Sequence, residues 1–154
     1  MLLRQLVQKE NNRYALSKEQ IRMITTASAL HDIGKISIPD EILNKPGRLT
    51  AEEFAVIKGH SMAGANMLSE LPLDQKEEPL VKTAYEICRW HHERYDGGGY
   101  PDGLKGEEIP VSAQVVALAD VYDALTSERC YKDAYSHEKA IEMILAGQCV
   151  HLIR

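Results

Sequence analysis

Residues 17–34, with the sequence SKEQIRMITTASALHDIG, indicate how this chain folds. Ser17 starts a capping box with the glutamine three residues later, a pattern that satisfies free backbone N–H groups at the start of a helix. Apolar residues follow at helical spacing, and Gly34 is suited to end the helix. The stretch therefore predicts one helix up to this glycine, with His31 and Asp32 in its last turn.

Helical periodicity also dominates the rest of the chain. Further helices are predicted over residues 2–9, 50–70, 79–94, 111–127 and 136–147. The loop over residues 96–110 holds five glycines and two prolines, and loops of this length are usually functional. No strand pair is evident, so the sequence predicts a single all-α domain over residues 1–154. The uncapped start at Met1 and the apolar tail over 148–154 suggest that both ends are incomplete.

Composition excludes several classes of protein. The net charge of -5 argues against a DNA-binding surface, which needs a basic face. Three cysteines without a C-x-x-C pair argue against a disulfide framework or a cysteine zinc site. No apolar run is long enough to cross a membrane, and the N-terminus lacks the features of a signal peptide. We expect a cytoplasmic protein.

Histidines and aspartates recur near the ends of the predicted helices and within them. Six of them are candidate metal ligands: His31, Asp32, His60, His91, His92 and Asp120. Neutral imidazole and carboxylate are ligands that Zn, Fe, Mn and Ni accept. Side chains at i and i+1 of a helix point about 100° apart, so adjacent ligands reach two ions more easily than one. The pairs therefore predict two metal ions about 3.5–4 Å apart, an arrangement suited to phosphoester hydrolysis.

Each candidate also has an ordinary structural interpretation. His60 alone is more often a structural histidine than a ligand, and Asp120 could be a hydrogen-bonded core aspartate. Lys35 could be a solvated lysine near a helix C-terminus. Tyr100 could serve ordinary turn packing, and Arg129 could be a surface charge.

Long, ordered motifs resemble one known family. They are His31-Asp32-Ile33-Gly34-Lys35-Ile36, then His60, then HHERYDGGGYP over residues 91–101, and ADVYDALTS over residues 119–127. Together they closely resemble the HD-GYP branch of the HD-domain phosphohydrolases across residues 13–147. The resemblance implies an all-α HD-domain helical bundle with a long Gly/Pro-rich GYP loop. It also implies hydrolysis of cyclic di-GMP to linear pGpG or GMP in bacterial signalling.

The resemblance also implies a role for each matching residue. His31, Asp32, His60, His91, His92 and Asp120 would hold two divalent ions, with Asp32 bridging them. Iron or manganese would be the usual ions, and zinc, nickel or magnesium are alternatives. Lys35 would act with Asp32 at the reaction centre. The substrate would be bound by Gly99, Tyr100, Pro101, Arg129 and Lys132. A receiver or sensory domain would precede the chain, and a homodimer is an open alternative.

The sequence departs from the family pattern at two places. Many members carry a further ligand histidine about 30 residues before the HD pair, whereas residues 1–30 here contain none. One ion would then have fewer protein ligands and bind more weakly. Cys130 stands where the family usually has proline, which would leave that turn freer.

Two other functions stay open at this point. The chain could be an HD phosphohydrolase acting on another nucleotide or cyclic dinucleotide. It could also be a non-catalytic signalling module that binds a ligand or a partner.

Overall fold

The computed structural model describes residues 16–128 and 134–147. All regular elements in these residues are helical, which confirms the predicted all-α class. The chain divides into two compact units with the boundary after Val116. The helix predicted over residues 2–9, the apolar tail over 148–154, Cys130, Arg129 and Lys132 lie outside the described residues.

The first unit holds most of the helices. They are α2 (Lys18–Ala27), α3 (Asp40–Leu43), α4 (Ala51–Ser69), α5 (Leu73–Lys76) and α6 (Pro79–Trp90), with the 3-10 turns η1 (Ser28–Leu30), η2 (Ile33–Ser37) and η3 (Gly106–Glu108). Helix α7 (Val111–Thr126) begins in the first unit and continues into the second, which also contains α8 (His137–Leu145).

Capping boxes are present at the starts of both α2 and α4. Gln20 N–H donates to Ser17 Oγ at 3.1 Å, and Ser17 N–H donates to the Gln20 side chain at 2.9 Å. Thr50 and Glu53 make the same pair of bonds, at 3.2 and 2.7 Å, at the start of α4. The Glu53 carboxylate also pairs with Lys45, which ties the preceding loop to this helix. Local sequence therefore defines where α2 and α4 begin.

The helix predicted over 17–33 is shorter than expected, because α2 ends at Ala27. The chain continues in tighter i→i−3 bonds, from His31 N–H to the Ser28 carbonyl and from Lys35 N–H to the Asp32 carbonyl. His31 and Asp32 therefore lie between η1 and η2, in a turn that we call the HD turn. Two four-residue helices, α3 and α5, were not predicted. A single helical turn shows too little periodicity to be recognised in a sequence.

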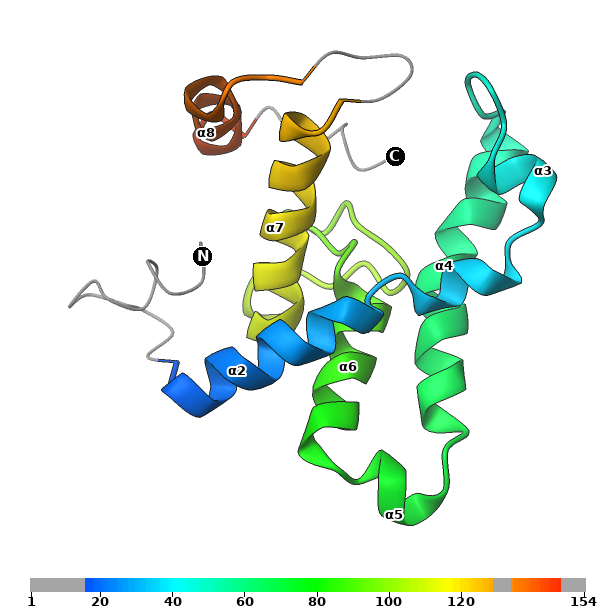
Figure 1. Ribbon diagram of the computed structural model, residues 1–154, viewed down its shortest axis with the longest axis vertical. Helices are drawn as coiled ribbons and strands as arrows, with labels where there is room; N and C mark the ends of the chain where they lie inside the picture. The colour runs from blue at the N-terminus through cyan, green and yellow to red at the C-terminus, as the bar shows by residue number, and fades with distance from the viewer. Residues whose placement is uncertain (1–15, 129–133, 148–154) are drawn as a thin grey trace. The chain divides into compact units, whose positions relative to one another are not determined.

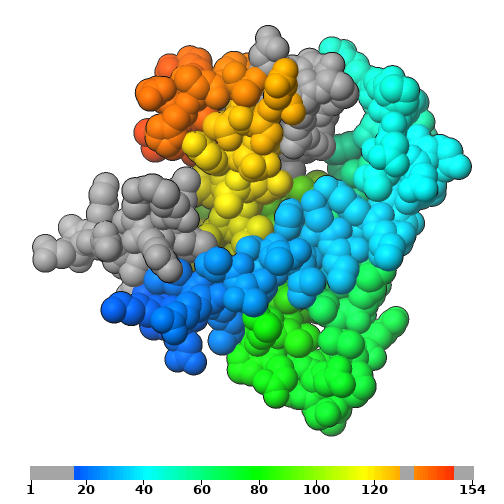
Figure 2. Space-filling view, in the orientation of Figure 1, coloured from blue at the N-terminus to red at the C-terminus, as the bar shows by residue number. Residues whose placement is uncertain are grey.

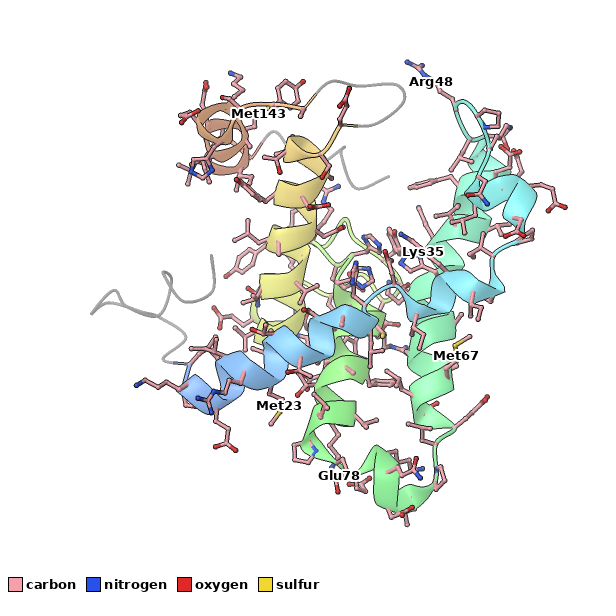
Figure 3. All side chains as sticks on the ribbon, viewed as in Figure 1. Met23, Lys35, Arg48, Met67, Glu78 and Met143 are labelled. Carbon is pink, nitrogen blue, oxygen red and sulfur yellow. The ribbon has the colours of Figure 1, made fainter. Side chains whose placement is uncertain are left out.

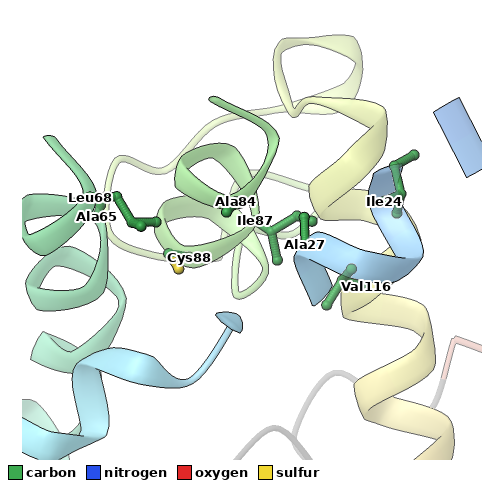
Figure 4. Packing of buried hydrophobic residues seen from close by; sticks show 8 residues of the cluster. All are labelled: Ile24, Ala27, Ala65, Leu68, Ala84, Ile87, Cys88 and Val116. Carbon is green, nitrogen blue, oxygen red and sulfur yellow. The ribbon is translucent and has the colours of Figure 1, made fainter. Parts of the chain in front are cut away.

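The core of the first unit is formed by α2, α4, α6 and the start of α7 (Figure 4). Its buried members are Ile24, Ala27, Ala65, Leu68, Ala84, Ile87, Cys88 and Val116. Ala65 and Ala84 are fully buried, and their small side chains let the helix backbones approach closely. Full burial of each isoleucine or leucine side chain contributes roughly 1.5–3 kcal/mol.

This packing places α4 and α6 side by side, while α2 crosses α6 (Figure 1). In the space-filling view, side chains of α2 and η2 form a continuous blue-to-cyan band across the first unit (Figure 2). Arg48 lies at the tip of the loop between α3 and α4 (Figure 3). The HD turn follows α2 and packs on α4, so it is held by the same helices that form the core.

The second unit is small and has its own apolar cluster. Val121 and Leu125 of α7 pack with Ala140 of α8. Ser136 caps α8 by accepting a hydrogen bond from Lys139 N–H at 3.3 Å. Among the described residues, no helix has both the length and the apolar character needed to cross a bilayer.

Candidate metal centre

Two glycines fix the HD turn against α4. A Cβ atom on Gly34 would lie 2.0 Å from the His60 carbonyl oxygen and 2.5 Å from the Gly64 nitrogen. A Cβ on Gly64 would in turn meet Gly34 N and the Ile33 side chain at 3.2 Å. Only glycine fits at position 34, and a side chain at position 64 would need its neighbours to shift by a few tenths of an ångström. The contact brings the HD turn next to His60.

Three of the candidate histidines are oriented by backbone carbonyls one turn earlier. His60 Nδ1 lies 2.7 Å from the Ile57 carbonyl, and His91 Nδ1 lies 2.8 Å from the Ile87 carbonyl. His31 Nδ1 lies 2.8 Å from the carbonyl of Ser28. A carbonyl can only accept, so each Nδ1 carries the proton and each Nε2 presents a lone pair. This is the orientation that metal-binding histidines usually have.

The Nε2 atoms converge between α4 and the end of α6. His60 Nε2 lies 3.4 Å from His91 Nε2 and 3.2 Å from His92 Nε2. All three imidazoles are buried, and their ligand atoms lie within 4.8 Å of one another. Because His60 and His91 both present lone pairs, their contact is repulsive without a positive charge between them. The Nδ1 atom of His92 is buried and has no hydrogen-bond partner among the described residues.

Asp32 lies at the edge of this cluster and faces two different histidines. Its Oδ2 atom is 3.2 Å from His31 Nε2, and its Oδ1 atom is 3.3 Å from His60 Nε2. Both contacts place a carboxylate oxygen against an imidazole lone pair. A divalent cation on each side of the carboxylate would turn these repulsions into coordination. The donor set of the described residues therefore fits metal ions.

Lys35, labelled in Figure 3, supplies the positive charge nearest to Asp32. Its Nζ donates to Asp32 Oδ2 at 2.6 Å from one turn further along the chain. This agrees with the expectation that Lys35 lies close to the HD pair. The lysine and a metal ion would share the same carboxylate.

Burial keeps the clustered imidazoles neutral. It lowers the pKa of His91 to about 4 and, together with the nearby imidazoles, that of His92 to about 2. Burial also lowers the pKa of His60. For Asp32, burial favours the neutral acid, but Lys35, together with His31 whenever that imidazole is protonated, outweighs it and holds the pKa well below its usual range. Near neutral pH the centre therefore presents uncharged imidazoles and an ionised carboxylate, the protonation states that metal binding requires.

The lowered pKa of His91 predicts a loss of stability in acid. Between about pH 6.5 and pH 4 this imidazole is protonated in the unfolded chain but neutral in the folded one. The unfolded state binds more protons in that window, so the free energy of unfolding falls as pH falls. We expect His91 alone to contribute a loss on the order of 3 kcal/mol from pH 7 to pH 4.

Urea denaturation of the metal-free protein, followed by circular dichroism, measures this loss. The variant His91→Gln lacks the titrating group, so its free energy of unfolding should depend less steeply on pH. A wild-type stability that stays constant or rises toward pH 4 would contradict the prediction.

The GYP loop, residues 96–110, is anchored to the end of α6 by side chains that were not among the predicted site residues. Asp102 accepts two hydrogen bonds from the Arg89 guanidinium, at 2.8 and 3.0 Å, and one from Trp90 Nε1 at 2.7 Å. Buried Glu93 accepts the backbone N–H groups of Asp102 and Gly103 through Oε1, at 2.7 and 3.0 Å. Glu93 directly follows the histidine pair in the motif HHERYDGGGYP. The motif did not indicate that its carboxylate binds the backbone of the loop.

Gly99 and Tyr100 lie against the histidine pair. A Cβ on Gly99 would approach Arg94 N to 2.4 Å and His92 O to 2.6 Å, so the loop passes directly over this backbone. Tyr100 N–H donates to the His92 carbonyl at 3.2 Å, and its ring stacks on the His92 imidazole with centroids 4.8 Å apart. Pro101 follows in a cis peptide bond. The tyrosine therefore packs directly on a candidate ligand.

Not every predicted site residue can be placed beside this cluster. The structure brings together His31, Asp32, Lys35, His60, His91, His92, Gly99 and Tyr100. Asp120 lies on α7 in the second unit, so its part in the centre stays a prediction. The roles of Arg129 and Lys132 also stay predictions.

Comparison with known proteins identifies the protein family. The family model described as HD domain matches residues 2–152, and the chain belongs to this family. HD domains are all-helical, metal-dependent phosphohydrolases, and the buried histidine cluster is compatible with a divalent metal. The resemblance drawn from the sequence motifs is confirmed.

Several curated proteins are similar to this chain. The chain is 45% identical to a "Probable cyclic di-GMP phosphodiesterase" of Vibrio cholerae over 98% of its length and 34% of the relative's. It is 47% identical to the cyclic di-GMP phosphodiesterase response regulator RpfG of Xanthomonas campestris, over 85% and 33%. It is 42% identical to 3'3'-cGAMP-specific phosphodiesterase 2 of Vibrio cholerae, over 90% and 26%. The chain thus spans about a third or less of each relative.

Proposed function

We propose that this chain is the catalytic domain of a phosphodiesterase that hydrolyses cyclic di-GMP with two divalent metal ions. The main support is the position of Asp32, whose two oxygens face the Nε2 atoms of His31 and His60 at 3.2 and 3.3 Å. A carboxylate with a different imidazole on each side suits a bridge between two ions. The names of the relatives support the substrate.

The first group of residues is proposed to bind the metal ions. His31, Asp32, His60, His91, His92 and Asp120 would hold the two ions, with Asp32 as the ligand that both would share. When bound, the ions would activate water and neutralise charge on the phosphate. Iron or manganese is the proposed metal.

Other residues act on the substrate. Lys35, whose Nζ is 2.6 Å from Asp32, holds a proton for the leaving oxygen. Gly99, Tyr100 and Pro101 form the loop side of the pocket, and Arg129 and Lys132 bind a phosphate. The anchoring of this loop by Glu93 and Asp102 keeps Tyr100 stacked on His92.

The relatives also support a proposal about the full-length protein. The name of the Xanthomonas relative includes a response regulator, and this chain spans about a third of that protein. We propose that a receiver or sensory domain precedes the chain in a cytoplasmic protein, and that residues 1–154 act as one domain.

A substrate panel tests the proposed function. Protein purified anaerobically with iron or manganese should hold about two ions per chain and cleave cyclic di-GMP faster than 3′3′-cGAMP or linear dinucleotides. Faster cleavage of 3′3′-cGAMP would assign the substrate named for the cGAMP-specific relative instead. A protein that holds well under one ion per chain and cleaves none of these would be a non-catalytic binding module.

A further inference from the structure

Lys58 lies between two aromatic rings beside the GYP loop. Its Nζ atom is 4.9 Å from the centroid of the Phe54 ring and 5.3 Å from that of the Tyr100 ring. Phe54 precedes it by one turn of α4, so the two side chains share a helix face. Tyr100 comes from the loop and stacks on His92. The ammonium group of Lys58 is therefore next to the residue that links the loop to the histidine cluster.

The ammonium group has no anionic partner in the part of the chain that the structure describes. Four of the other lysines there have a carboxylate partner: Lys35 with Asp32, Lys45 with Glu53, Lys82 with Glu77 and Lys139 with Glu142. Lys58 contacts only the faces of the two rings, and no hydrogen-bond acceptor among the described residues receives its three N–H donors. Aromatic rings attract the cation but leave those donors free for an incoming anion.

The neighbourhood suits a phosphate. Lys58 is half-buried, so an ion pair formed there is screened by water less than one on the open surface. An ammonium group is also a common phosphate ligand in proteins. Tyr100 beside it presents an aromatic ring of the kind that stacks with nucleobases. A nucleotide lying against Tyr100 would bring a phosphate oxygen within reach of Lys58.

We propose that Lys58 binds a phosphate group of the cyclic dinucleotide at the Tyr100 side of the histidine cluster. This assignment rests on the proposed function for the class of ligand. The rings of Phe54 and Tyr100 flank the ammonium group, and its three N–H groups donate to the phosphate oxygens. Lys58 thus contributes to substrate binding from α4, whereas the other proposed contacts on this side come from the GYP loop.

Equilibrium binding of a phosphorothioate analogue of cyclic di-GMP that resists hydrolysis tests the proposal. The variant Lys58→Met keeps the apolar stem between the rings and removes the charge, and it should weaken binding about tenfold. Lys58→Arg restores a cation and should bind within a few fold of wild type. Lys82→Met, which removes an exposed lysine of α6, serves as the matched control and should bind as wild type does.

The metal content and melting temperature of each variant separate binding from structure. A residue that only supports the fold would change the melting temperature and leave the dissociation constant unaltered, which would overturn the assignment.

If wild type hydrolyses cyclic di-GMP while Lys58→Met binds the analogue equally well, only the role of Lys58 is wrong. If binding depends on Lys58 but no hydrolysis occurs, the catalytic function is wrong and the phosphate site stands. If wild type does not bind the analogue, both are wrong.

Discussion

Replacing Asp32 with alanine should abolish hydrolysis and release metal from both proposed positions. The Asp32 carboxylate faces His31 and His60 with separate oxygens, so its removal takes one ligand from each ion. It also leaves Lys35 without its partner, which adds positive charge where cations should bind. We expect a fall in kcat of at least about a thousandfold and a metal content well below that of wild type.

Elemental analysis and initial rates measure the two effects together. Asp74→Ala removes an exposed aspartate in the first turn of α5 and serves as the matched control. It should keep wild-type metal content and rate. An Asp32→Ala protein with undiminished metal content would contradict the bridging role, even if its activity were lost.

Replacing Gly34 with alanine should cause a large loss of stability and of metal binding. The added methyl group would lie 2.0 Å from the backbone oxygen of His60, which cannot move without shifting α4. Steric overlap of this kind in a packed interior costs about 3 kcal/mol or more. If the variant folds, the HD turn must move away from α4, which separates Asp32 from His60.

Gly59→Ala is the matched control for this change. Gly59 lies on α4, next to His60, and a Cβ there would meet nothing within 4 Å. Because alanine favours a helix over glycine, Gly59→Ala should raise the free energy of unfolding by up to about 1 kcal/mol. Thermal or urea denaturation compares the two variants. Equal stability of Gly34→Ala and wild type would show that the close contact does not constrain the fold.

Local sequence signals were enough to predict most of the helices and the histidine cluster. Capping boxes act over three residues, so Ser17 and Thr50 could be recognised without knowledge of the fold. The pairs at 31–32 and 91–92 indicated a metal centre because adjacent side chains diverge on a helix. The cluster of His60, His91 and His92 agrees with that expectation.

Features that depend on contacts distant in sequence could not be predicted in this way. The bonds from Arg89 and Trp90 to Asp102 join residues 12 or 13 positions apart, across a loop whose path no short pattern defines. Likewise, the stop of α2 at Ala27 comes with the packing of Gly34 on α4, which lies far along the chain. Lys58 was missed because a single lysine on a helix usually faces solvent.

The hydrogen bonds that tie three of the imidazoles to backbone carbonyls have a consequence for ion selectivity. Because His31, His60 and His91 are each held by a carbonyl in the preceding turn, their rings cannot swivel freely to suit ions of different radius. The distances between the ligand atoms then depend on how far apart the backbone segments lie. At the HD turn the contact of Gly34 with Gly64 sets that separation. The backbone, more than the chemistry of the ligands, therefore determines which ionic radius fits.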